Sequence, residues 1–142
     1  SYEYDVRFNI YGCALQQPGD YLAYGLGAGQ STAYLMEKYR EKGFDYYILK
    51  RYHAHNQYLE ELMEIGIPGL LLFLLAWLSI PVCARKEHRT FAWLFLTMYG
   101  MNMLTDCMFG KFDGIVLWAF GMVYLLLVPG VTDAQSLPSR TA

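Results

Sequence analysis

A run of 19 residues without a single charge, residues 66–84, constrains the fold of this chain more than any other feature; its sequence is GIPGLLLFLLAWLSIPVCA. A helix of this length covers about 28 Å, close to the hydrocarbon thickness of a bilayer. Two further apolar runs follow, residues 91–109, interrupted only by Asp106, and residues 114–130. Buried helices of a large soluble core would show a polar face over this length. We therefore predict an all-α membrane protein with three transmembrane helices.

The charge balance of the chain excludes one large class of function. Its 11 basic and 13 acidic residues give a formal net charge of −2. Proteins that bind nucleic acid carry a basic surface, so we expect no nucleic-acid partner. The cysteines, Cys13, Cys83 and Cys107, are odd in number and lack a paired short spacing. They predict neither a disulfide framework nor a zinc site.

Basic residues in the short loops predict the orientation of the helices. Residues 85–90, RKEHRT, carry three fixed positive charges, whereas the next loop holds only Lys111 and Asp113. The positive-inside rule places the more basic loop in the cytoplasm. Residues 1–65 then form a periplasmic segment, and residues 131–142 form a disordered cytoplasmic tail.

The periplasmic segment is predicted to fold as short helices joined by turns. One helix is expected over residues 5–17 and another over residues 31–42. Ser31 suits the N-cap of the second helix, and Gly43 suits its end. A third helix is expected to begin at Asn56, which is a favoured capping residue, and to run into the first span.

Three glycines at alternate positions, Gly25, Gly27 and Gly29, form the most flexible stretch of this segment. A nucleotide site would need the full dinucleotide spacing within a βαβ unit, which the sequence lacks. We predict a tight turn, because glycine permits positive φ angles.

Positive and titratable side chains gather just before the third helix, at Lys50, Arg51, His53 and His55. Cations beside the free N–H groups of a helix start form a natural site for an anion such as phosphate. The alternative is that Lys50 and Arg51 contact lipid headgroups at the membrane surface. The residues alone do not separate these two interpretations.

Two titratable residues are candidates for a catalytic role: His55 in the loop before the first span and Asp106 in the second span. His55 can accept a proton or serve as a neutral hydrogen-bond partner near neutral pH. With His53 it offers too few ligands for a metal motif, so we predict no metal site. Asp106 is costly inside a membrane span and shares a helix face with Asn102. Both are expected near the outer end of their helix, either approaching His55 or forming an interhelical hydrogen bond.

Three motifs together resemble a known family. Residues 55–71, HNQYLEELMEIGIPGLL, resemble the His-Asn signature that closes the periplasmic loop of the O-antigen ligase and polymerase superfamily. Residues 7–15, RFNIYGCAL, are similar to an upstream element of that family, and residues 24–29, YGLGAG, to its glycine turn. The resemblance covers about residues 5–128 and includes the predicted topology.

The resemblance implies a glycosyltransferase of the bacterial inner membrane that needs no metal or other cofactor. Such an enzyme moves a glycan from an undecaprenyl-diphosphate carrier to an acceptor, which is a sugar hydroxyl of the lipid A core for a ligase and a second carrier-linked glycan for a polymerase. It assigns catalysis to His55 and Arg7 and makes Arg51 and Asn56 candidates for substrate binding. An arginine and a helix N-terminus suit an anionic diphosphate leaving group.

Length is the main departure from that family, whose members carry more spans than three. We therefore expect this stretch to be the C-terminal portion of a larger glycosyltransferase and to be inactive alone. Three functions stay open: a ligase, a polymerase with the same chemistry, and a non-catalytic membrane fragment whose loop only packs or binds a partner.

Overall fold

The computed structural model describes residues 2–127, and in this part of the chain all regular secondary structure is helical. The predicted tail, residues 131–142, lies outside the described residues. In chain order the helices are α1 (Tyr2–Ala14), η1 (Pro18–Asp20), α2 (Ser31–Glu41), α3 (Asp45–Lys50), α4 (Gln57–Cys83), η2 (Lys86–His88), α5 (Arg89–Met103), η3 (Met108–Gly110) and α6 (Phe112–Leu127). The predicted all-α class is confirmed.

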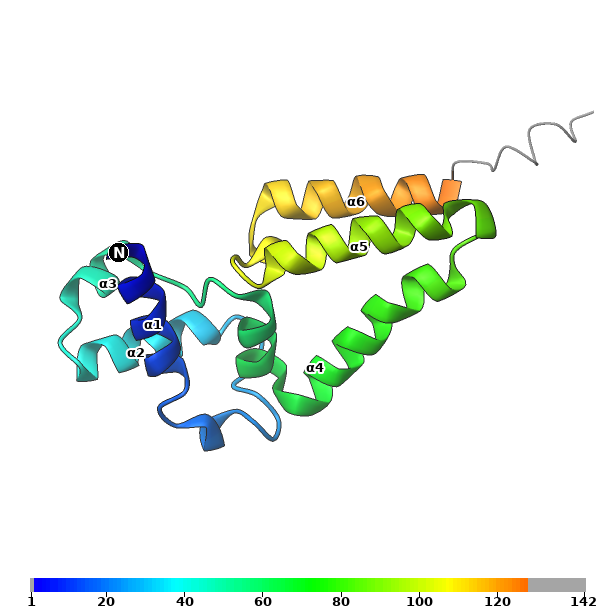
Figure 1. The fold of residues 1–142 in the computed structure, drawn as a ribbon. Helices are drawn as coiled ribbons and strands as arrows, with labels where there is room; N and C mark the ends of the chain where they lie inside the picture. The colour runs from blue at the N-terminus through cyan, green and yellow to red at the C-terminus, as the bar shows by residue number, and fades with distance from the viewer. Residues whose placement is uncertain (1, 128–142) are drawn as a thin grey trace, which may run out of the picture.

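The N-terminal helices pack around a core of their own, at one end of the molecule (Figure 1). α2 lies against α1, α3 and the start of α4. The core combines tyrosines with smaller apolar side chains: Ile10, Cys13, Ala14, Tyr21, Tyr34, Leu35, Tyr39, Ala54, Met63 and Cys107. Because Met63 belongs to α4 and Cys107 follows α5, this core also anchors the helices that come later in the chain.

The predicted helix boundaries in this region are partly wrong. α1 ends at Ala14 rather than residue 17. The N-cap of α2 is Gln30, and Ser31 instead turns its hydroxyl to the Glu64 carboxylate at 2.7 Å, so tertiary contact overrides its capping tendency. Gly43, with φ +68°, follows α2 as predicted.

α4 begins where the sequence predicts and then bends. Asn56 is its N-cap and accepts a hydrogen bond from the N–H of Leu59 at 3.1 Å. At Gly66 the backbone leaves the helical region, with φ 68° and ψ −173°. The bend divides α4 into a short arm, residues 57–65, and an apolar long arm, residues 67–83. Over the described residues, α4 is the one helix long and apolar enough to cross a membrane.

Residues 22–27, which include the start of the predicted glycine turn, pack against this bend. The N–H groups of Leu26 and Gly27 donate to the carbonyls of Met63 and Glu64 at 2.8 and 3.0 Å. The N–H of Ile67 donates to the carbonyl of Leu22 at 2.8 Å. These bonds pair backbone groups that the broken helix cannot pair itself. The predicted turn therefore has a structural role, because its backbone hydrogen bonds bridge the bend of α4.

The second predicted span is shorter than expected. α5 ends at Met103, so Asp106 lies in the following turn and not inside a helix. Thr105 Oγ1 donates to the carbonyl of Asn102 at 3.0 Å, and the N–H of Cys107 donates to Asp106 Oδ1 at 2.9 Å. Such local side-chain bonds compete with helix hydrogen bonds and end α5 before residue 109.

α5 and α6 have 15 and 16 residues, or about 23 Å each, so they fall short of the hydrocarbon thickness. α4 is long and apolar enough to cross a membrane, and α6 is apolar but shorter. The three transmembrane helices therefore stay a prediction.

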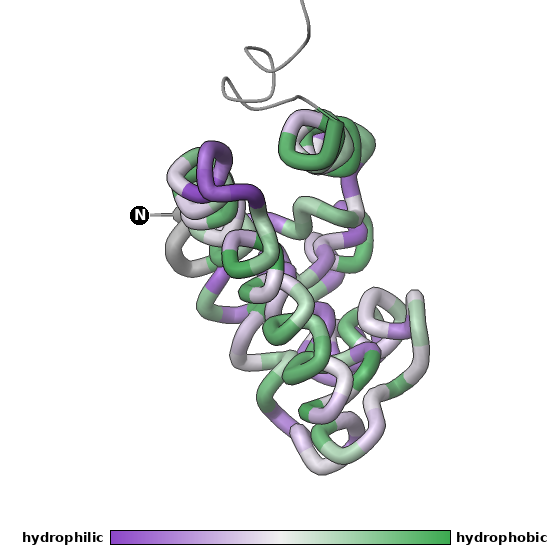
Figure 2. Tube along the Cα trace, turned by 90° about the vertical axis from the view of Figure 1, so that its right-hand side faces the viewer, coloured by the Kyte–Doolittle hydropathy of each residue, from purple (hydrophilic) through white to green (hydrophobic). Residues whose placement is uncertain are grey.

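An aromatic core joins the long arm of α4 to α5 and α6. Trp77 stacks on Trp118 with ring centroids 4.7 Å apart, and Tyr99 lies 5.5 Å from Trp77. The Tyr99 hydroxyl donates to the carbonyl of Gly114 at 2.8 Å, which ties α5 to α6. Figure 2 views these helices from the end where α4 meets α5, with hydrophilic residues in the connecting turn and apolar residues along the helices.

Candidate functional site

His55 lies in the linker between α3 and α4, directly before the N-cap Asn56. Its backbone is left-handed, with φ 49°, a conformation that non-glycine residues rarely adopt. Non-glycine residues held in this backbone conformation cost of order 1–3 kcal/mol each and concentrate at functional sites. The linker therefore holds His55 in a conformation that the surrounding structure must enforce.

The two histidines of the linker form a stacked pair. The imidazole rings of His53 and His55 lie 4.1 Å apart at their centroids, with an interplanar angle of 28°. The backbone N–H of His55 donates to His53 Nδ1 at 3.2 Å. This bond leaves the other ring nitrogen of His53 to carry its proton when the ring is neutral.

Asp106 reaches the histidine pair from the turn between α5 and α6. One carboxylate oxygen of Asp106 and one ring nitrogen from each of His53 and His55 lie within 4.8 Å of one another. The carboxylate also forms an ion pair with Lys111. Of the two positions predicted on that helix, Asp106 does approach His55, whereas the Asn102 amide donates back to the carbonyl of Met98 in its own helix.

A buried glutamine fixes this turn to the start of α4. Gln57 is only 3% exposed, and its Oε1 accepts a hydrogen bond from the N–H of Phe109 at 2.9 Å. Its amide donates to Glu61 Oε1, also at 2.9 Å. Gln57 lies two residues after His55, so one short segment carries the histidine and holds the turn that carries Asp106.

The surroundings keep His55 neutral at neutral pH. Burial lowers the pKa of His55, and the neighbouring charges of His53, Arg7 and Lys111 lower it further, against an opposing effect of Asp106. Burial also raises the pKa of Asp106, but hydrogen bonds from Lys111 and from the N–H of Cys107 outweigh burial and leave that pKa below its ordinary value. A neutral imidazole beside an ionised carboxylate is the arrangement that general-base chemistry requires.

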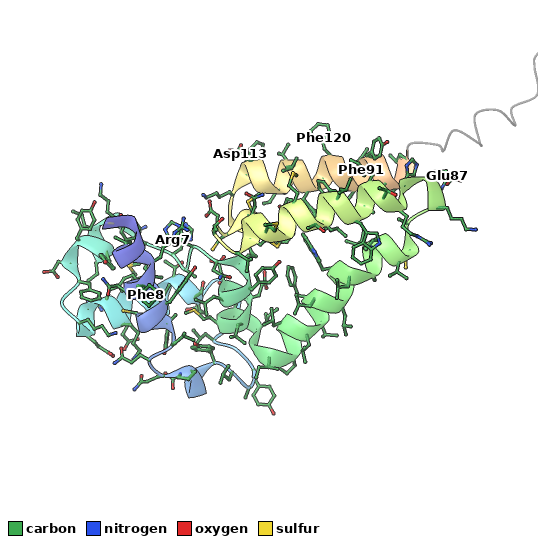
Figure 3. All side chains as sticks on the ribbon, in the orientation of Figure 1. Arg7, Phe8, Glu87, Phe91, Asp113 and Phe120 are labelled. Carbon is green, nitrogen blue, oxygen red and sulfur yellow. The ribbon has the colours of Figure 1, made fainter. Side chains whose placement is uncertain are left out.

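Arg7 belongs to α1, and its guanidinium is exposed (Figure 3). It is close enough to His55 for its charge to affect the histidine pKa. The other two sequence candidates have different surroundings. Arg51 is exposed at the C-cap of α3 with φ 50°, and the Asn56 side chain is occupied as the N-cap of α4. Their predicted role in substrate binding stays a prediction.

By distance alone, His53, His55 and Asp106 could hold a metal ion. Part of this set is otherwise engaged, because His53 Nδ1 accepts from the N–H of His55 and the Asp106 carboxylate binds the Lys111 ammonium. A cation would have to displace that ammonium and would lie near Arg7. The residues present therefore fit a metal poorly, and the positive charges favour an anion.

Sequence reasoning missed two residues of this site. In the sequence, Lys111 stands out only as a loop charge, although it is the ion-pair partner of Asp106. Gln57 stands out only as a residue of the predicted helix start. Its position beside the histidine motif was the available signal, but the contact with Phe109 joins residues 52 positions apart and cannot be deduced from spacing.

Residues 3–74, which are 72 of the 142 residues, match the family described as O-antigen ligase. The chain belongs to the O-antigen ligase family. Members of this family are glycosyltransferase-like enzymes associated with bacterial membranes, and the family implies a lipid-linked glycan substrate. Comparisons with curated proteins and with solved structures gave no match.

The family match and the site overlap only in part. The matched residues include Arg7 and His55 and end within the long arm of α4. Asp106 and Lys111 lie beyond the match, and the structure brings them to the histidine pair. The site is therefore composed of residues from both sides of the match boundary.

Proposed function

We propose that the chain carries the catalytic loop of an O-antigen-ligase-type glycosyltransferase, which moves a glycan from an undecaprenyl-diphosphate carrier to a sugar hydroxyl of the lipid A core. The observation that carries the proposal is the position of His55, which is half-buried beside the Asp106 carboxylate and close enough to Arg7 and Lys111 for their charges to affect it. Residues 1–65 face the periplasm in this proposal, and the turn at residues 85–90 faces the cytoplasm.

The chemistry follows from the charges of the site. The acceptor hydroxyl oxygen attacks the anomeric carbon of the donor sugar, and the bond from that carbon to the diphosphate oxygen breaks. Neutral His55 takes the hydroxyl proton, and the ionised Asp106 stabilises the imidazolium that results. Arg7 stabilises the negative charge that develops on the departing undecaprenyl diphosphate.

Complementation tests this assignment. The protein at its full natural length, carrying His55→Asn, would be expressed in a strain from which the natural protein has been deleted. Asparagine is chosen because it tolerates a left-handed backbone, whereas alanine would be strained there. Loss of a general base costs about 10²- to 10⁴-fold in rate. Arg7→Ala should also abolish transfer, whereas Arg7→Lys keeps a positive charge and should retain part of it. Arg40→Ala, an exposed arginine on α2, is the matched control.

Surface-glycan banding and carrier-linked intermediates would be measured at equal membrane levels of each variant. Loss of surface glycan with accumulation of carrier-linked polymer supports the ligase. Accumulation of single carrier-linked repeats would favour the polymerase. Normal banding in both the His55 and Arg7 variants would refute the catalytic assignment and leave the non-catalytic alternative. Transfer by the purified protein should persist in the presence of a chelator, in keeping with metal-independent chemistry.

A further inference from the structure

A small polar pocket lies beside the histidine pair, on the side of His53. Its volume is about 180 Å³, and six residues line it: Thr32, His53, Glu60, Cys107, Gly110 and Lys111. They come from α2, the α3–α4 linker, the short arm of α4 and the turn before α6. At about 30 Å³ per water molecule this is space for about six waters, which suits one monosaccharide ring and not a long chain.

The pocket is lined by one acidic and one basic side chain, so its charges are balanced. The carboxylate of Glu60 disfavours a diphosphate, and the ammonium of Lys111 disfavours a cation. Together with the hydroxyl of Thr32 and the imidazole of His53 they offer donors and acceptors in one small space. A neutral ligand with several hydroxyl groups satisfies such a set, because each hydroxyl both donates and accepts.

The side chains that would bind such a ligand are held in place. Glu60 is half-buried, and its Oε1 lies 3.5 Å from the Ser31 Oγ, whose proton points to Glu64 at 2.7 Å. Lys111 is held by its ion pair with Asp106 and has further N–H donors to offer. The pocket is therefore formed before a ligand arrives, which lowers the entropic cost of binding.

A second cavity of the same region has a different character. The cleft between α4 and α5 has a volume of about 400 Å³, and mostly apolar side chains line it, among them Trp77, Leu78 and Met101. It offers few partners for hydroxyl groups. The contrast assigns the polar pocket, and not the larger cleft, to a sugar.

We propose that the pocket at Thr32, His53, Glu60 and Lys111 is a monosaccharide subsite that binds the hydroxyl groups of one sugar ring beside His55. The inference rests on the proposed glycosyl transfer and deepens it. The ring has two possible sources, the terminal sugar of the acceptor and the first sugar of the carrier-linked donor. Glu60 and Thr32 are positioning residues in this proposal, since they bind the sugar away from the bond that breaks.

The test uses Thr32→Val and Glu60→Gln in the protein at its full natural length, purified in detergent. Each loses hydrogen bonds to the sugar, so the KM for one substrate should rise about five- to tenfold while kcat changes less than about twofold. Thr32→Ser should restore the KM. Thr90→Val on α5 and Glu37→Gln on α2 are matched controls with exposed side chains. The probes are lipid A core glycolipid and an undecaprenyl-diphosphate-linked glycan.

The pattern of KM changes identifies the sugar. A rise confined to the glycolipid acceptor places its terminal sugar in the pocket, and a rise confined to the donor places the carrier-linked sugar there. Unchanged KM values for both substrates would overturn the subsite and leave the transfer reaction intact.

Binding measured by calorimetry separates this proposal from the transfer reaction. The ligands are core oligosaccharide and a short-chain prenyl-diphosphate sugar. If the unaltered protein transfers nothing, yet Thr32→Val weakens binding of one ligand, the subsite stands and the proposed function fails. If neither variant changes binding of either ligand, the subsite is wrong.

Discussion

The N-terminal region, residues 2–66, and the apolar region, residues 67–127, satisfy their side chains in different ways. Buried tyrosines in the N-terminal region find carbonyl partners, as Tyr21 does with Ala14 at 2.8 Å and Tyr39 with Tyr52 at 3.3 Å. The apolar region leaves many large apolar side chains exposed, including Leu72, Leu75, Val82, Leu94, Phe120 and Leu126. An exposed apolar surface of this extent suits lipid or further helices as the surroundings of the second region.

The site lies where these regions meet, and neither region contains all of it. His53, His55 and Arg7 come from the N-terminal region, and Asp106 and Lys111 come from the apolar region. The contacts that join the two regions therefore hold the site together. Changes to the backbone packing of the joint should have the largest effect, and changes to the charge of one histidine the smallest.

The largest loss of stability is expected from Gly25→Ala, in the segment whose backbone hydrogen bonds bridge the bend of α4. Gly25 has φ +77°, and a Cβ there would lie 2.1 Å from the carbonyl oxygen of Glu64. Left-handed strain and overpacking against backbone together should cost about 3 kcal/mol or more. Thermal unfolding of the purified protein measures this loss. Gly19→Ala is the control, because nothing lies within 4 Å of a Cβ at that position. Equal stability of the two variants would show that close packing of Gly25 against the bend is dispensable.

A smaller effect is expected from Gln57→Ala, which removes one side-chain hydrogen bond between the two regions. The N–H of Phe109 would lose its partner in a buried position, at a cost of about 2 kcal/mol. Hydrogen exchange should rise in the turn that carries Asp106 and stay unchanged in α2. The exposed residue Gln16 provides a matched control as Gln16→Ala. Exchange that rises evenly over both regions would mean that they unfold as one unit.

The smallest effect is expected from protonation of His55. Its pKa is lowered in the folded protein, by burial first and by positive neighbours second, so the unfolded chain binds the proton more tightly. Its contribution to stability is complete above about pH 6.5, the ordinary histidine value, and is lost as the pH falls through the lower folded pKa. His55→Asn should flatten the acid side of the stability profile measured by thermal unfolding. A profile identical to that of the unaltered protein would contradict the shift.

Much of the fold could be predicted from local patterns. The start of α4 at Asn56 and the end of α2 near Gly43 follow from capping residues, and the glycine turn follows from backbone freedom. The end of α5 and the first turn of α2 could not be predicted this way. α5 ends where Asp106 accepts a hydrogen bond from the N–H of its neighbour Cys107, whereas at α2 the Ser31 hydroxyl bonds the distant Glu64 and leaves the capping position to Gln30.

The site shows the same division. The motif at His55 and Asn56 is continuous in sequence and could be recognised. Arg7 could be predicted too, because residues 7–15 resemble an element of the same family. Lys111 and Gln57 could not, because their roles depend on contacts that the α5–α6 turn creates. A charge pattern identifies which residues are available, and only the fold decides which of them meet.

The bond pattern at Gly66 has a mechanical consequence. A helix broken at a glycine would ordinarily act as a hinge, but here the backbone of residues 22–27 bonds both arms of α4 across the break. These bonds oppose hinge motion at Gly66, and they couple the orientation of the apolar long arm to that of the short arm, which His55 and the N-cap Asn56 directly precede.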